Sequence, residues 1–179
     1  MALSLAAVNG LSLTDFVARF GDVAEHSPWV AARAAEARPY ASRDAMHEAF
    51  VAAVAASPLD DRLALIRAHP DLAGRAAVAG TMADDSKKEQ SSAGLDRLTS
   101  EEFARFQMLN ERYRDRFGFP FILAVKGATK DQILASFAER VDNDRDVEFA
   151  RALAEIARIF RFRIEDRVAP ADAPSSEGP

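Results

Sequence analysis

Apolar residues recur three and four positions apart along most of this chain, which is the spacing of one face of a helix. Two such stretches, 29–37 and 59–68, each follow a Ser-Pro step, in which a cap residue precedes proline at the first helical position. Ser42 can cap a third stretch, which carries Met46 and Phe50 on one face. The pattern therefore predicts a succession of short helices in the first part of the chain.

Two stretches in the middle of the chain have the spacing of a capping box, which marks a helix N-terminus. Ser86 and Glu89 form one pair, and Thr99 and Glu102 form the other. The second pair opens a long helical pattern that should end at Gly118, because glycine is favoured just beyond a helix. The first pair leaves two roles open for Glu89, that of a helix cap and that of a catalytic carboxylate.

The rest of the chain is also helical in pattern. Thr129 should cap a helix that runs to about 141, and a last helix should run from about 146 to 168. No segment shows a convincing alternation of apolar and polar residues. The sequence therefore predicts an all-α, single-domain helical bundle over residues 1–168 with no significant β-sheet, and a flexible Pro, Ala and Ser tail over 169–179.

One apolar run, 119–125, does not fit a helix. It contains Pro120, is short, and lacks the alternation of a half-buried strand. A buried extended segment fits best, although ordinary core packing is the simpler alternative. Buried backbone N–H and C=O groups need hydrogen-bond partners, and here no sheet would supply them. A ligand is therefore one candidate partner for this segment.

His69 lies between a predicted helix and Pro70. Proline disfavours helical geometry at the residue before it, so His69 should mark a helix end, where side chains can face a cavity. Only the tertiary fold could bring Glu89 close to it, and an imidazole beside a carboxylate suits acid–base chemistry. The alternative is that His69 is a hydrogen-bonded structural residue.

Arg163 interrupts the apolar stripe of the last helix. It lies seven positions after Ile156, which at about 100° per residue returns it to the stripe, whereas Arg161 falls off it. Arg163 should therefore point inward and meet a carboxylate of the protein or of a substrate. Alternatively, its stem packs while its charged head reaches water.

Composition narrows the range of partners. The chain has 179 residues, a formal net charge of -5 and no cysteine, so disulfides and thiolate sites are excluded. No basic run stands out, which argues against nucleic acid, and the apolar start over 1–8 is too short to span a bilayer. We expect a cytoplasmic protein with a small-molecule or protein partner, and neither nucleic acid nor membrane.

Most familiar catalytic motifs are missing from the sequence. His26, His47 and His69 show no paired-ligand spacing, so no metal site is predicted. A nucleophile elbow, a phosphate loop and a dinucleotide fingerprint are also absent. Any chemistry should therefore come from His69, Glu89 and Arg163.

Several blocks of residues follow one another in an order that is specific when they are taken together. They are His69-Pro70-Asp71-Leu72-Ala73, then Ser86 with Glu89-Gln90, then Ala93-Gly94-Leu95, then Asn110, Tyr113 and Phe117-Gly118-Phe119-Pro120-Phe121, and last Ala152-Leu153 with Glu155-Ile156 and Arg163. With these blocks the chain resembles the 2-oxo-4-hydroxy-4-carboxy-5-ureidoimidazoline (OHCU) decarboxylase family. The similarity extends over nearly the whole chain up to about residue 168.

The resemblance implies a cofactor-independent, homodimeric decarboxylase of urate breakdown that converts OHCU to (S)-allantoin. His69 matches the family's catalytic general acid or base, and Glu89 matches an essential residue that assists it. The substrate-binding positions implied in the same way are Pro70, Ser86, Lys87, Lys88, Glu89, Gln90, Phe121, Ile122, Leu123, Ala124, Val125 and Arg163.

Two alternatives from other classes remain open at this point. One is a non-enzymatic helical interaction module, in which His69 and Glu89 act as caps and Arg163 is a structural charge. The other is hydrolysis of a ureido bond, which would need an activated water and normally a metal ion. Release of carbon dioxide and sensitivity to a chelator distinguish the three.

Overall fold

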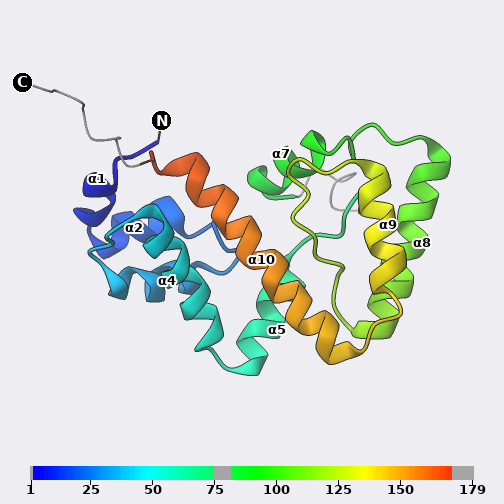
Figure 1. Cartoon of the computed structure of the whole chain (residues 1–179), viewed down its shortest axis with the longest axis horizontal. Coiled ribbons are helices and arrows are strands. Elements are labelled where there is room, and N and C mark those ends of the chain that lie inside the picture. The colour runs from blue at the N-terminus through cyan, green and yellow to red at the C-terminus, as the bar shows by residue number, and fades with distance from the viewer. Residues whose placement is uncertain (1, 75–81, 171–179) are drawn as a thin grey trace, which may run out of the picture. The chain divides into compact units, whose positions relative to one another are not determined.

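The computed structural model describes residues 2–74 and 82–170. Among these residues no β-strand forms, and an isolated bridge between Leu3 and Val168 is the sole pairing of that kind. The prediction of an all-α fold is confirmed. The chain divides into two compact units, residues 1–57 with 160–179 and residues 58–159, a division that the sequence pattern does not indicate (Figure 1).

The first unit is built from short helices and the end of a long one. They are α1 (Leu5–Asn9), α2 (Leu13–Phe20), α3 (Pro28–Ala34), the 3-10 turn η1 (Ala35–Ala37), α4 (Arg43–Ala55) and the last part of α10 (Arg145–Arg167). The helix expected over 29–37 is confirmed, with its last turn tightened into η1. Rings of Phe16, Phe50 and Phe160 meet in the core, with centroids 6.4 and 6.0 Å apart along this series.

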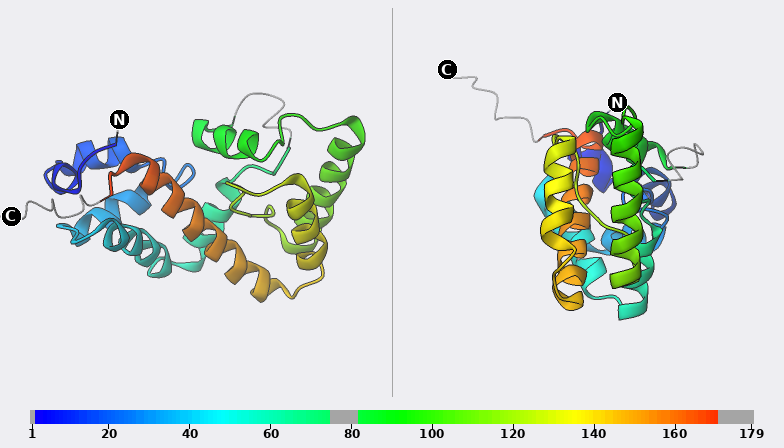
Figure 2. Two further views of the ribbon diagram at one scale, coloured as in Figure 1. Left: turned by 45° about the horizontal axis from the view of Figure 1, so that its top comes forward. Right: turned by 90° about the vertical axis from the view of Figure 1, so that its right-hand side faces the viewer.

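The second unit contains α5 (Leu59–Ala68), α7 (Asp84–Ser92), α8 (Ser100–Phe117), α9 (Lys130–Arg140) and the first part of α10. Helices α8 and α9 lie side by side (Figures 1 and 2). Their facing aromatic side chains fill the space between them, and Phe106 and Phe137 meet edge to face at 6.2 Å between centroids. The helix expected over 59–68 is confirmed as α5, but the cap predicted before it is wrong, because Pro58 and not Ser57 occupies the cap position.

The later helices begin and end where the sequence predicts at most positions. Thr99 and Glu102 form a complete capping box at the start of α8. Gly118 ends that helix with φ 76°, a left-handed conformation that glycine adopts without strain. Thr129 caps α9, and α10 spans nearly the range expected for the last helix.

The capping box predicted for Ser86 and Glu89 is wrong. Helix α7 begins earlier, at Asp84, and Ala83 occupies the cap position. Asp84 and Asp85 account for the difference, since carboxylates in a first turn interact favourably with the positive end of the helix dipole. Glu89 therefore lies within the helix, and its role as the box carboxylate is excluded. A polar loop was expected over 80–86; residues 80–81 lie outside the described ones, and the others are helical from Asp84.

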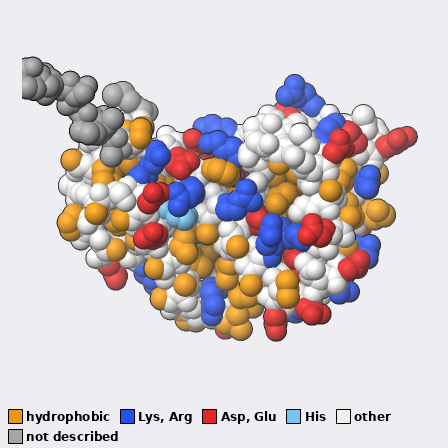
Figure 3. Space-filling model, in the orientation of Figure 1, with side chains coloured by type: hydrophobic (Ala, Val, Ile, Leu, Met, Phe, Trp, Pro, Cys, Tyr) orange, Lys and Arg blue, Asp and Glu red, His pale blue; other side chains and the backbone are white. Residues whose placement is uncertain are grey.

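The surface carries charges of both signs. On the face shown in Figure 3, Lys and Arg side chains are interspersed with Asp and Glu.

Near the end of the described chain, the Ala169 N–H donates to the Leu3 carbonyl oxygen at 2.8 Å. The flexible tail expected over 169–179 lies outside the described residues from 171 onward, and its flexibility stays a prediction.

Candidate active site

His69 lies where helix α5 ends. Its backbone is extended, with φ -73° and ψ 139°, as the following proline requires. The side chain is buried, and its Nδ1 atom lies 2.9 Å from the Leu65 carbonyl oxygen. A carbonyl oxygen only accepts hydrogen bonds, so Nδ1 carries a proton. In the neutral form of the ring the lone pair then lies on Nε2, which is the nitrogen that can act as a base.

Side chains of α8 hold the turn that follows His69. They lie at positions 107, 110 and 114, which share one face of the helix. The Arg114 guanidinium binds the Asp71 carboxylate at 3.0 and 3.1 Å, the Asn110 amide donates to the Leu72 carbonyl oxygen at 2.8 Å, and the Gln107 amide donates to the Ala73 carbonyl oxygen at 2.8 Å. Ala73 has φ 52°, an unfavourable value for alanine that these contacts maintain.

Gln90 of α7 binds the same turn from its other side. Its Oε1 atom accepts a hydrogen bond from the Ala73 N–H at 2.9 Å, and its Nε2 group donates to the Asp71 carbonyl oxygen at 3.3 Å. The residue is 5% exposed. The structure thus gives the Gln90 amide a place in the turn beside His69, and substrate binding by Gln90 stays a prediction.

Helix α7 presents its predicted site residues to different surroundings. Ser86 and Gln90, four positions apart, are buried, whereas Lys87 and Lys88 are exposed and Glu89 is half-buried. Lys87 lies 3.8 Å from the Asp84 carboxylate. The half-buried position of Glu89 suits a carboxylate that has to meet a substrate. Together with Ala73, Ser91 and Phe103, Lys87 and Gln90 contribute to the lining of a pocket of about 590 Å³.

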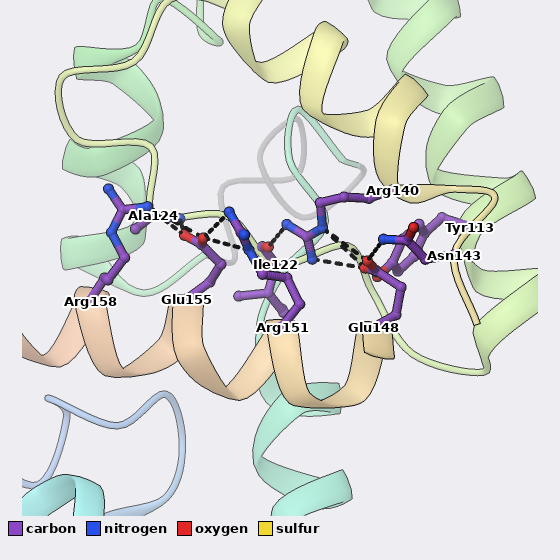
Figure 4. Close-up of polar contacts among 9 residues, drawn as sticks. All are labelled: Tyr113, Ile122, Ala124, Arg140, Asn143, Glu148, Arg151, Glu155 and Arg158. Atoms are coloured by element: carbon purple, nitrogen blue, oxygen red, sulfur yellow. Dashed lines mark hydrogen bonds and ion pairs between the residues drawn. The ribbon is translucent and has the colours of Figure 1, made fainter. Parts of the chain in front are cut away.

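The run 119–125 is buried and non-helical, as predicted, with Leu123 its one half-buried member. Protein side chains supply partners for two of its backbone groups. The Ala124 N–H donates to Glu155 Oε2 at 3.0 Å, and the Arg140 Nη1 group donates to the Ile122 carbonyl oxygen at 2.8 Å (Figure 4). A ligand is therefore not the sole partner of this segment, because two of its polar groups are satisfied by the fold itself.

A buried ion pair lies behind one of these contacts. Arg140 Nη2 is 2.9 Å from Glu148 Oε2, and their side chains are 4% and 0% exposed. Asn143 Nδ2 and the Tyr113 hydroxyl also donate to Glu148. Burial alone would raise the pKa of Glu148, but hydrogen bonds from Arg140, Tyr113 and Asn143 hold that pKa below its ordinary value. The pKa of Tyr113 is raised, mainly by burial and to a smaller extent by the hydrogen bond to Glu148.

The sequence interpretation missed Arg140, Glu148 and Glu155 as residues with a role in the site. A signal for the two glutamates was present, because they lie seven positions apart on a helix whose other buried residues are mostly apolar. Both are almost completely buried, Glu155 being 1% exposed. Helical spacing also indicates that Arg140 points inward, since it lies seven positions after the buried Ile133 and three after the buried Phe137 on α9, although its partner Glu148 is set only by the tertiary fold.

Arg163 points inward, as predicted. It is 2% exposed, and its Nη1 atom lies 2.9 Å from Glu25 Oε2. The alternative in which its charged head reaches water is wrong, because the buried Glu25 supplies the partner that a buried guanidinium needs. Arg161 lies off the stripe, with a side chain 41% exposed and bound to Asp44. Substrate binding by Arg163 stays a prediction.

No helix in residues 2–74 and 82–170 is both long enough and apolar enough to cross a membrane. Within the same ranges, no group of three or more His, Asp or Glu side chains is arranged to hold a metal ion.

Comparison with known proteins identifies the family. A family model described as OHCU decarboxylase matches residues 9–165. The 2-oxo-4-hydroxy-4-carboxy-5-ureidoimidazoline decarboxylase of Haloferax volcanii is 45% identical over 165 residues, which are 92% of this chain and 96% of that protein. The uric acid degradation bifunctional protein PucL of Bacillus subtilis is 46% identical over 155 residues, which are 87% of this chain and 30% of that protein.

A solved structure supports the fold. A crystal structure of (S)-allantoin synthase matches with a TM-score of 0.77 and 30% identity, and the match covers 96% of this chain and 56% of that one. The fold and site are those of an all-α protein with a histidine at a helix end and a buried, non-helical segment held by side chains. The chain belongs to the OHCU decarboxylase family, which confirms the resemblance seen in the sequence.

The buried pair gives a test of pH dependence. Tyr113→Phe should lower the free energy of unfolding at pH 7 by about 1–3 kcal/mol, because Glu148 loses a buried donor. A carboxylate with a lowered folded pKa stabilises the fold above its unfolded pKa, about 4.3, and this stabilisation is lost as the pH falls through the folded pKa. Since the variant raises that folded pKa, its difference from wild type should shrink in acid. Urea denaturation from about pH 7 to pH 3 measures this difference.

Tyr40→Phe is the matched control for this test. The Tyr40 hydroxyl is buried and donates to the Ala34 carbonyl oxygen at 2.7 Å, a partner that does not titrate. Burial raises the pKa of Tyr40 to about 12, so the hydroxyl keeps its proton throughout the range. Its loss should cost the same at each pH. Equal pH dependence in both variants would contradict the account of Glu148.

Proposed function

We propose that this chain decarboxylates OHCU to (S)-allantoin in urate degradation, with His69 as the general acid or base and Glu89 assisting it. The observation that carries the proposal is the match to the OHCU decarboxylase family over residues 9–165. The environment of His69 supports it, because a ring whose Nδ1 is bound to a backbone carbonyl offers Nε2 for proton transfer.

The reaction needs few groups. When the bond between the ring carbon and the carboxylate breaks, carbon dioxide leaves and the electron pair stays on the ring, delocalised over neighbouring heteroatoms. A proton must then reach the neighbouring, ureido-bearing carbon on one face, while the carbon that lost carbon dioxide becomes a carbonyl as its hydroxyl gives up a proton. His69 takes that hydroxyl proton at Nε2 and delivers it to the ureido-bearing carbon, and Glu89 engages the substrate hydroxyl or orients the imidazole. The side of the ring that His69 addresses sets the configuration of the allantoin.

The remaining predicted residues bind the substrate. Ser86 and Gln90 lie on the buried face of α7, and the backbone of Phe121 to Val125 reads the ring and ureido edges. Because the Ala124 N–H and the Ile122 carbonyl oxygen already bond to side chains, this recognition falls to the other polar groups of the segment. Arg163 orients the anionic substrate.

We propose further that the protein acts as a homodimer in the cytoplasm and needs no cofactor. The activity resides in one domain over 1–168, which a flexible tail follows. Light scattering coupled to gel filtration tests the dimer. A mass equal to that of one chain at the concentration of the assay would exclude it.

The activity is tested with OHCU generated freshly from urate. Carbon dioxide release and the circular dichroism of (S)-allantoin should both appear faster with the protein than by spontaneous decay, and a chelator should change neither rate. No acceleration would favour a helical interaction module without catalytic activity. Inhibition by the chelator would favour a metal-dependent hydrolase.

His69→Ala and Glu89→Ala should each lower kcat by about two to four orders of magnitude, the usual contribution of acid–base groups. Their unfolding curves should stay close to that of the wild type. Asp84→Ala is the matched control for kcat, since this exposed carboxylate lies on the same helix and outside the predicted substrate-binding positions. If Glu89→Ala loses stability and keeps its kcat, Glu89 is a structural residue.

Arg163→Lys keeps the charge but loses the planar, two-pronged geometry of a guanidinium. It should therefore raise KM for OHCU by about tenfold or more, the loss of roughly one charge-assisted hydrogen bond. Arg161→Lys, on the exposed side of the same helix, should leave KM unchanged. The reverse outcome would mean that Arg161 is the residue that meets the substrate.

A further inference from the structure

The apolar run 119–125 has an unusual mode of attachment for a buried segment. It belongs to no helix or sheet, yet two of its backbone groups are bound by ionic side chains at defined distances. Glu155 accepts from the Ala124 N–H at 3.0 Å, and Arg140 donates to the Ile122 carbonyl oxygen at 2.8 Å. These contacts fix one residue of the segment by its N–H and another by its C=O.

Both contacts depend on one face of α10, although Arg140 itself is the last residue of α9. Glu148 and Glu155 are seven positions apart, and Figure 4 shows both side chains rising from that helix toward the segment. Glu155 contacts the segment directly, whereas Glu148 acts through Arg140, which it binds at 2.9 Å. The first part of α10 thereby fixes the positions of the Ala124 N–H, directly, and of the Ile122 carbonyl oxygen, through Arg140.

Stability alone does not explain charged groups in this position. Burying an ion pair costs several kcal/mol of desolvation per ion, and apolar residues of similar volume often give an equal or more stable fold. The segment already has apolar side chains, and the Phe121 ring stacks on Phe137 with centroids 3.7 Å apart. What the ionic groups add is direction, because hydrogen bonds to a carboxylate and a guanidinium hold backbone atoms in one orientation.

The charge on Glu155 is balanced from the outside. Arg151 Nη2 lies 3.0 Å from Oε1, and Arg158 Nη1 lies 3.1 Å from Oε2. Their side chains are 50% and 55% exposed, whereas that of Glu155 is 2% exposed. Glu155 therefore connects solvated cations to a buried N–H. Either arginine can be removed without taking away the carboxylate that binds Ala124.

We propose that Glu155, together with Arg140 held by Glu148, acts as a positioning residue that keeps the Phe121 to Val125 backbone in its substrate-binding conformation. The inference rests on the proposed function, in which this backbone reads the substrate ring. Glu155 does not touch the substrate. It acts through the orientation of Ala124 and of the groups on either side of it.

The test compares two substitutions at one position in the full chain. Glu155→Ala removes the acceptor and should lower kcat/KM for OHCU by about 10- to 100-fold, mainly through KM, because misplaced binding groups weaken productive binding. Glu155→Gln keeps an oxygen that accepts from the Ala124 N–H, so it should restore kcat/KM to within about fivefold of wild type. Arg151→Ala and Arg158→Ala, the matched controls, should stay within about threefold.

A second readout is independent of turnover. Amide hydrogen exchange over Phe121 to Val125 should become faster in Glu155→Ala and return toward wild type in Glu155→Gln. If Glu155→Ala does not fold, Glu155→Asp replaces it. That variant keeps the charge but withdraws it by one methylene, and it should show the same loss of kcat/KM and the same faster exchange.

Specific outcomes would overturn the proposal. They are an unchanged kcat/KM in Glu155→Ala, a Glu155→Gln variant no better than Glu155→Ala, or unchanged exchange in the segment. A wild-type protein that does not accelerate decarboxylation would overturn the proposed function instead. Hydrogen exchange would then still decide whether Glu155 positions the segment.

Discussion

The need to satisfy polar backbone groups in the protein interior shapes the second unit more than any other constraint. The run 119–125 is buried without belonging to a helix or sheet, so its N–H and C=O groups must find other partners. Glu155 and Arg140 supply two of them. Because Arg140 needs a countercharge in the same place, Glu148 and its donors Tyr113 and Asn143 follow from the same requirement.

The same principle applies around His69. The residue leaves its helix in an extended conformation, and the turn after it is not regular secondary structure. Gln107, Asn110 and Arg114 bind this turn from α8, and Gln90 binds it from α7. In both places side chains from neighbouring helices supply the hydrogen bonds that adjacent strands would supply in a sheet. Irregular backbone is thereby held rigid where substrate contacts are proposed.

The sequence predicted those features that depend on local spacing. Ser42, Thr99 and Thr129 were correctly identified as caps, and Gly118 as a helix end, because each acts within a few residues. The inward direction of Arg163 was also predicted, since helical phase determines it. The predicted start of α7 was wrong because two sequence preferences compete there. Acidic residues in the first turn prevailed over a serine cap.

Features that depend on long-range partners could not be predicted. The sequence gives no sign that Glu25 would meet Arg163, or that the Ala124 N–H would meet Glu155, because these partners are far apart in the chain and neither is set by a period. Resemblance to a family supplied the reaction, but it supplied no role for Arg140 or Glu148. The division into two units was likewise invisible in the hydrophobic pattern.

The central claim is that His69 presents Nε2 to the substrate while Leu65 holds Nδ1. Nitrogen-15 NMR of the histidine side chains, recorded with and without (S)-allantoin, tests it most directly. We expect a protonated Nδ1 in His69 and a shift of its Nε2 signal on binding, with His26 and His47 unchanged. A proton on Nε2 in the free protein, or an Nε2 signal that does not respond to (S)-allantoin, would contradict the claim.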